Sequence, residues 1–172
     1  MTAPYASRQQ FEVYRFNPIL TVLVPLAALA IQAYLPLKLP FFTLFDLPLL
    51  VTIYFGVARR NQVAGLLTGC VIGLFQDGLT HQPFGLYGMA KTVVGYIASS
   101  LGLRIDVDNP GSRLLMTISF YVVHQLVYYV AARGLANQAL VWRWGHELIA
   151  AVANGLLAGV LFMVFDRFRQ RA

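Results

Sequence analysis

The chain has 172 residues, of which 58% are hydrophobic and 12% are charged. A soluble domain of this length would carry roughly twice that charged fraction, and its helices would show apolar stripes where this sequence has long apolar blocks. The composition therefore excludes an ordinary soluble domain and predicts one membrane domain.

The formal net charge of +6 does not indicate nucleic-acid binding, because the arginines fall between the apolar blocks and at the two ends. Basic flanks of this kind are typical of membrane topology signals and of contacts with anionic lipid head groups. The single cysteine, Cys70, lies inside an apolar block, so a disulfide within the chain and a thiolate metal cluster are both excluded.

Six apolar blocks predict six transmembrane helices, since a spanning helix needs about 20 mostly apolar residues. The blocks cover roughly residues 19–35, 41–58, 63–79, 84–103, 114–132 and 148–165. We therefore expect an all-α membrane fold with a cytoplasmic N-terminal segment at residues 1–18, a transmembrane domain at 19–166 and a cytoplasmic basic tail at 167–172.

Two segments need separate interpretation. The sequence Ala28-Leu29-Ala30 could be taken for a signal-peptidase site, but apolar residues continue past it and Glu12 lies upstream, so we expect the first block to be retained. Residues 133–147 carry Trp142 and Trp144 on either side of Arg143, a pattern typical of the head-group region. We expect this stretch to lie along the membrane surface.

The distribution of Lys and Arg predicts the orientation. With both chain ends on one face, the opposite face holds only Lys38, Arg133 and Arg143. The positive-inside rule then places both termini in the cytoplasm. The face with the chain ends carries Arg8, Arg15, Arg104 and Arg113, and also the predicted basic contacts with lipid or protein, which are Arg59, Arg60, Arg167, Arg169 and Arg171.

Small residues recur at four-residue spacing, which in lipid allows helix backbones to approach closely. They form stripes on the third, fourth and sixth blocks, and their glycines are Gly65, Gly69, Gly73, Gly95, Gly155 and Gly159. The favoured interpretation is packing within the chain. The alternative is that one stripe receives a helix from a partner or from a second copy of the chain.

Asp77 and Lys91 are ionisable residues inside predicted spans, where such groups usually face the interior and pair. They lie about 9 and 12 Å from the loop that joins their helices, so a salt bridge between them is predicted. The pair would either lock the third helix to the fourth or form the floor of an outward-facing cavity. The sequence leaves both open.

The fifth block adds a polar and aromatic face with Tyr121, His124 and Gln125, and the sixth block adds Asn154. Polar groups at this depth must face protein or water. Together with Asp77 and Lys91 they are numerous enough to line one shared pocket or buried polar network. A buried histidine, however, is more often a structural hydrogen-bond donor than a ligand contact.

The sequence offers no catalytic machinery. No serine or cysteine nucleophile has an evident base, no glycine-rich phosphate loop precedes a lysine, and no HExxH or CxxC pattern is present. We expect no enzymatic activity, no cofactor and no metal site.

The stretch from Gly73 through Asp77, Gly85 and Lys91 to Gly95-Tyr96 resembles the family of the rod shape-determining protein MreD. The turn at residues 108–110 followed by Arg113 is similar as well. The resemblance places Tyr96 on the family motif and adds it to the predicted polar network.

The resemblance implies a non-enzymatic scaffold of the cell-elongation complex in the bacterial inner membrane, with a six-helix fold similar to the substrate-binding component of energy-coupling-factor vitamin transporters. It also implies the partners: the single-span protein MreC, the actin-like MreB, the glycosyltransferase RodA and its class B penicillin-binding protein. A homodimer is a further possibility that the sequence leaves open.

The alternative function is a substrate-binding component of a vitamin transporter. Members of that class usually carry an Ala-xxx-Ala motif in the first helix for docking the energising subunit. Here Ala27, Ala28, Ala30 and Ala33 have no alanine four residues later, so the motif is missing. We therefore favour the scaffold.

Overall fold

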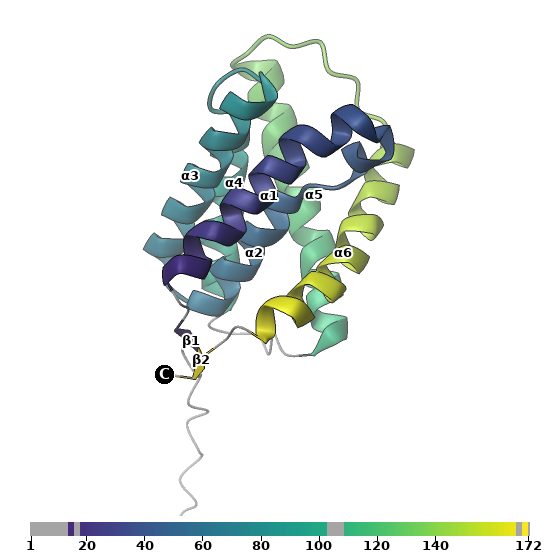
Figure 1. Cartoon of the computed structure of the whole chain (residues 1–172). Helices are drawn as coiled ribbons and strands as arrows, with labels where there is room; N and C mark the ends of the chain where they lie inside the picture. The colour runs from purple at the N-terminus through teal and green to yellow at the C-terminus, as the bar shows by residue number, and fades with distance from the viewer. Residues whose placement is uncertain (1–13, 16–17, 103–108, 168–169, 172) are drawn as a thin grey trace, which may run out of the picture.

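The structure, a computed structural model, describes residues 14–15, 18–102, 109–167 and 170–171. Six α-helices follow one another in an up-and-down bundle (Figure 1). They are α1 (Pro18–Lys38), α2 (Leu47–Arg59), α3 (Gln62–Thr80), α4 (Leu86–Leu101), α5 (Pro110–Gly134) and α6 (Trp144–Asp166), and a short 3-10 helix, η1 (Pro40–Leu44), precedes α2.

The prediction of an all-α membrane fold with six helices is confirmed. Within the described part of the chain, five stretches are long and apolar enough to cross a membrane, with η1 and α2 counted together as Pro40–Arg59. The fourth helix is the exception in length, because α4 has 16 residues and reaches about 24 Å. The first helix does not end at Pro36 as expected but continues to Lys38, with Pro25 and Pro36 inside it.

Two short strands near the chain ends pair on one side of the bundle. Strand β1 (Tyr14–Arg15) pairs antiparallel with strand β2 (Gln170–Arg171). Both strands lie beside the ends of the first and last helices (Figure 1). We call this the terminal side, and the side with η1, the α3–α4 loop and the α5–α6 loop the opposite side. That the terminal side faces the cytoplasm stays a prediction.

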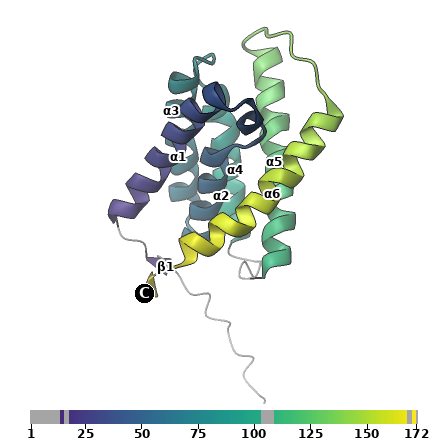
Figure 2. The ribbon, with the colours of Figure 1, turned by 45° about the vertical axis from the view of Figure 1, so that its right-hand side comes forward.

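The α5–α6 connection lies on the opposite side, as Figures 1 and 2 show. Helix α5 extends to Gly134 and α6 begins at Trp144, so no helix forms between them. Trp142 packs edge-on against Trp144, with 5.5 Å between ring centroids. The expectation that this segment lies along the membrane surface stays a prediction.

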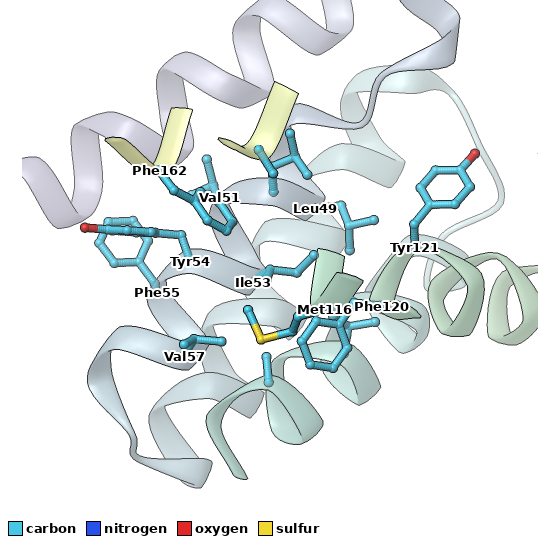
Figure 3. Packing of buried hydrophobic residues seen from close by; sticks show 14 of the residues in the cluster. Leu49, Val51, Ile53, Tyr54, Phe55, Val57, Met116, Phe120, Tyr121 and Phe162 are labelled. Carbon is cyan, nitrogen blue, oxygen red and sulfur yellow. The ribbon is translucent and has the colours of Figure 1, made fainter. Parts of the chain in front are cut away.

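Helix α2 forms the centre of the bundle. Every residue from Pro48 to Ala58 is buried, and Leu49 and Ile53 are completely enclosed. Figure 3 shows side chains of α2 packed among Met116 and Phe120 of α5 and Phe162 of α6. In contrast, α1 buries only Ala28 and Leu29 and exposes most of its apolar side chains, as expected for a helix that faces lipid.

Glycines bring α3 and α4 into backbone contact. A Cβ atom added to Gly69 would overlap the carbonyl of Lys91, and one added to Gly95 would overlap the carbonyl of Gly65. Gly65 and Gly73 face α4 in the same way. Helix α4 therefore occupies the face of this stripe that a partner helix would need.

The stripe on α6 is only partly used. A Cβ at Gly155 would lie 2.9 Å from Leu114 and Ile118 of α5, whereas one at Gly159 would have no neighbour within 4 Å. Gly159 therefore does not take part in packing against the described residues, and the alternative, that this part of the stripe receives a helix from a partner, stays a prediction.

The α3–α4 contact predicts a position-specific effect of adding one methyl group. Gly69→Ala should destabilise the protein by about 1–3 kcal/mol, because a well-packed contact must open to admit the new carbon. Gly78→Ala on the same helix is the matched control, since nothing lies within 4 Å of the added carbon there. Thermal unfolding in detergent measures both. Equal behaviour of the two variants would contradict the packing account.

Candidate functional site

The second membrane span is broken between η1 and α2, and this break organises the site. Pro40–Arg59 is one apolar stretch, yet α2 begins only at Leu47. Asp46 caps α2, since its Oδ1 atom accepts a hydrogen bond from the Leu49 amide at 3.0 Å and a proline occupies the first turn. By helical rise the cap lies about 20 Å from the terminal side, deep within the span.

Two amide side chains satisfy the backbone groups that the break leaves without helical partners. Gln32 of α1 donates to the Phe45 carbonyl at 3.0 Å and accepts from the Leu47 amide at 3.0 Å. Asn154 of α6 accepts from the Asp46 amide at 2.9 Å and donates to the Leu44 carbonyl at 2.7 Å. Non-helical backbone is tolerated at membrane depth only when protein groups satisfy it in this way.

The carboxylate of Asp46 is also one half of a buried ion pair. Its Oδ2 atom lies 2.7 Å from Nζ of Lys91, which is completely enclosed. Nε2 of His124 lies 3.2 Å from the same ammonium and 3.7 Å from the same carboxylate oxygen. Helices α2, α4 and α5 thus meet at one charged cluster, and a charge without a partner here would be costly.

An aromatic stack extends from this cluster toward the opposite side. The Lys91 ammonium lies 4.8 Å from the centre of the Tyr87 ring. Tyr87 is parallel to His124 at 5.8 Å and stacked on Tyr128 at 4.7 Å. The Tyr128 hydroxyl donates to Gln82 in the α3–α4 loop at 3.3 Å. The stack therefore places protein side chains between the charged cluster and the opposite side.

Asp77 has a different role from the one predicted. Its carboxylate, fully buried at the end of α3, accepts hydrogen bonds from the amides of Gly85, Tyr87 and Gly88 at 2.9–3.1 Å. A carboxylate at a helix N-terminus is stabilised by the free amides and the helix dipole. Asp77 therefore caps α4, and the predicted Asp77–Lys91 salt bridge is wrong.

The loop that brings the α4 amides to Asp77 depends on one glycine. Gly85 precedes α4 with a φ of +102°, a conformation that L side chains rarely adopt. The spacing of Asp77, Gly85 and Gly88 therefore has a structural reason. The turn at Gly85 brings the first amides of α4 to the Asp77 carboxylate, and these hydrogen bonds hold the α3–α4 hairpin together.

The profile of the rod shape-determining protein MreD matches residues 13–171, which is nearly the whole chain. The chain belongs to the MreD family. No curated protein and no solved structure matches it. The fold similarity to vitamin-transporter components therefore stays a prediction. Family membership indicates a multi-pass inner-membrane protein with a role in rod shape determination.

The remaining predicted residues of this MreD-family chain separate into three locations. Lys91, His124 and Asn154 join the network around Asp46. Tyr121 and Gln125 instead contact Glu147 of α6, at 3.2 and 2.8 Å. The structure places Tyr96 on the outside of α4, where its side chain is 46% exposed, so its assignment to the network is wrong.

On the terminal side, the basic residues are distributed over several helix ends. Arg59 ends α2, Arg60 follows in a left-handed conformation, and Arg167 follows α6. Arg113 of α5 forms an ion pair with Asp166 of α6 at 2.6 Å. Arg171 lies in β2, and Arg169 lies outside the described residues.

Sequence reasoning missed Asp46 and Gln32. The signal for Asp46 is the sequence Asp46-Leu47-Pro48, because a carboxylate just before a proline in the first turn is typical of a helix start. That signal would have divided the second apolar block and supplied a partner for Lys91. Gln32 carries no such signal in its neighbours.

The ion pair predicts strongly non-additive stability. Asp46→Asn keeps a cap on α2 but leaves the Lys91 ammonium without a counter-charge, so the loss should be about 3–5 kcal/mol. Lys91→Met should also be destabilising. The double variant should lose much less free energy of unfolding than the two single losses added together. Unfolding of the purified variants in detergent measures the coupling, and additive losses would disprove the pairing.

Proposed function

We propose that this MreD-family protein is a non-enzymatic scaffold of the cell-elongation complex. In this role it holds an MreC-like single-span protein, an MreB-like actin homologue, RodA and a class B penicillin-binding protein together for lateral cell-wall growth. The match to the family over residues 13–171 carries the proposal. Both termini are proposed to be cytoplasmic, in agreement with the excess of arginine on the terminal side.

The use of the buried polar groups supports a scaffold. Lys91, His124 and Asn154 are at most 1% exposed, and they contact Asp46 or the backbone around the break. The Asp77 carboxylate accepts hydrogen bonds from the first turn of α4. These contacts fix α2, α3, α4, α5 and α6 relative to one another, as a scaffold requires, and they favour this function over vitamin binding.

The lateral surface supports the same proposal. Helix α1 exposes Val22, Leu23 and Leu26, and α6 exposes Leu156 and Val160, each at 49% or more. Exposed apolar faces of this kind suit contacts with single-span helices as well as with lipid.

Photo-crosslinking in rod-shaped cells tests the proposal. A photoreactive amino acid at Leu23 or at Leu156 should give adducts with an MreC-like or RodA-like protein from at least one of the two faces. The matched control is the buried Leu49, which should give none. Pull-down from the same membranes should also recover the MreB-like protein. Recovery of no elongation component would contradict the scaffold, and tight co-purification of a small vitamin would support the transporter alternative.

A further inference from the structure

Helices α1 and α3 enclose an apolar groove that opens toward the lipid. Its volume is about 420 Å³, and its walls include Val22 and Pro25 of α1 and Leu67, Val71 and Phe75 of α3. The side chains of Val22, Leu67, Val71 and Phe75 are each at least 50% exposed. Among the described residues, no side chain fills the space between the two helices here.

The length of the groove distinguishes between two kinds of occupant. The α1 wall extends from Thr21 to Leu29 and the α3 wall from Leu67 to Phe75, which is about 12 Å along each helix. Both helices begin on the terminal side, and by helical rise the groove begins about 5–8 Å from their first residues. It ends at about mid-span on α1 and about 5 Å beyond mid-span on α3. A transmembrane helix of a partner crosses about 30 Å of hydrocarbon, whereas an acyl chain occupies one leaflet. The groove fits the acyl chain.

A guanidinium group lies at the terminal-side end of this groove. The Arg59 side chain donates from its NH2 nitrogen to the hydroxyl of Thr21, a wall residue, at 3.0 Å, and its Cζ atom lies 5.4 Å from the centre of the Phe55 ring. Arginine has five donors, and within the described residues one hydrogen bond is recorded for this group. The other donors remain for a ligand at the head-group level.

We propose that the groove and Arg59 together bind an anionic phospholipid. One acyl chain lies between α1 and α3, and the phosphate accepts hydrogen bonds from the Arg59 guanidinium, whose fork matches phosphate oxygens. The net-basic terminal side selects a lipid with net negative charge over a zwitterionic one. This site is independent of the proposed scaffold function.

Native mass spectrometry of the purified protein in a neutral detergent tests the headgroup contact. Phosphatidylglycerol should bind in preference to phosphatidylcholine, and Arg59→Gln should weaken its binding at least about tenfold, the loss expected for hydrogen bonds to a charged group. Arg133→Gln is the matched control. Arg133 likewise donates to a hydroxyl, that of Tyr129 at 2.8 Å, and its Cζ atom lies 5.5 Å from that ring, but on the opposite side. Equal loss in both variants would reduce the effect to bulk charge and overturn the proposal.

A second pair of variants tests the acyl-chain contact. Val71→Trp should fill the groove and displace phosphatidylglycerol, whereas Val160→Trp, at a position of α6 with 61% exposure, should not. Unfolding without lipid should be the same for both variants, which shows that each folds. Glycerol phosphate, which lacks a chain, should not compete. Unchanged lipid binding by Val71→Trp, or a crosslink from residue 71 to a partner helix and not to lipid, would overturn the proposal.

Discussion

Backbone amides and carbonyls inside lipid must have hydrogen-bond partners within the protein. The second span is interrupted within the membrane, between η1 and α2, so its backbone groups there lack helical partners. The chain satisfies them by placing Gln32 and Asn154, from the first and last helices, against the break before α2. The amide of Gln32 and the amide of Asn154 each donate and accept, so one side chain serves two backbone groups. The outer helices are thereby tied to the centre of the bundle by specific bonds, in addition to apolar contact.

Two buried carboxylates are stabilised by two different means. Asp46 neutralises Lys91 and caps α2, while Asp77 receives three amides of α4 and needs no cation. Because each charge already has its partners, the interior functions as a rigid frame. The proposed scaffold would use these fixed helices and their exposed apolar faces, and the groove beside Arg59 is a separate, proposed lipid site.

The sequence predicts features of this structure that depend on composition and local spacing. The apolar blocks predict the six helices, and the four-residue spacing of Gly65, Gly69 and Gly73 predicts a closely packed face, which the structure places against α4. The partner of Lys91 was not predicted. The nearest acidic residue along the chain, Asp77, accepts hydrogen bonds from the α4 amides, and the actual partner is Asp46 at the start of α2. Three-dimensional packing decides which of two acidic residues a buried lysine contacts, and helical spacing alone does not identify that residue. The same reason explains Tyr96, whose position on a motif says nothing about which face of α4 is covered.

Asp46, at a break in the second span, is the counter-charge of Lys91. A cryo-EM map of the protein in a lipid nanodisc, with an antibody fragment bound for size, tests it most directly at side-chain resolution. In this map α2 should start at Leu47, the Lys91 ammonium should contact Asp46, and Asp77 should lie against the first turn of α4. A continuous helix through Asp46, or density that joins Lys91 to Asp77, would contradict it.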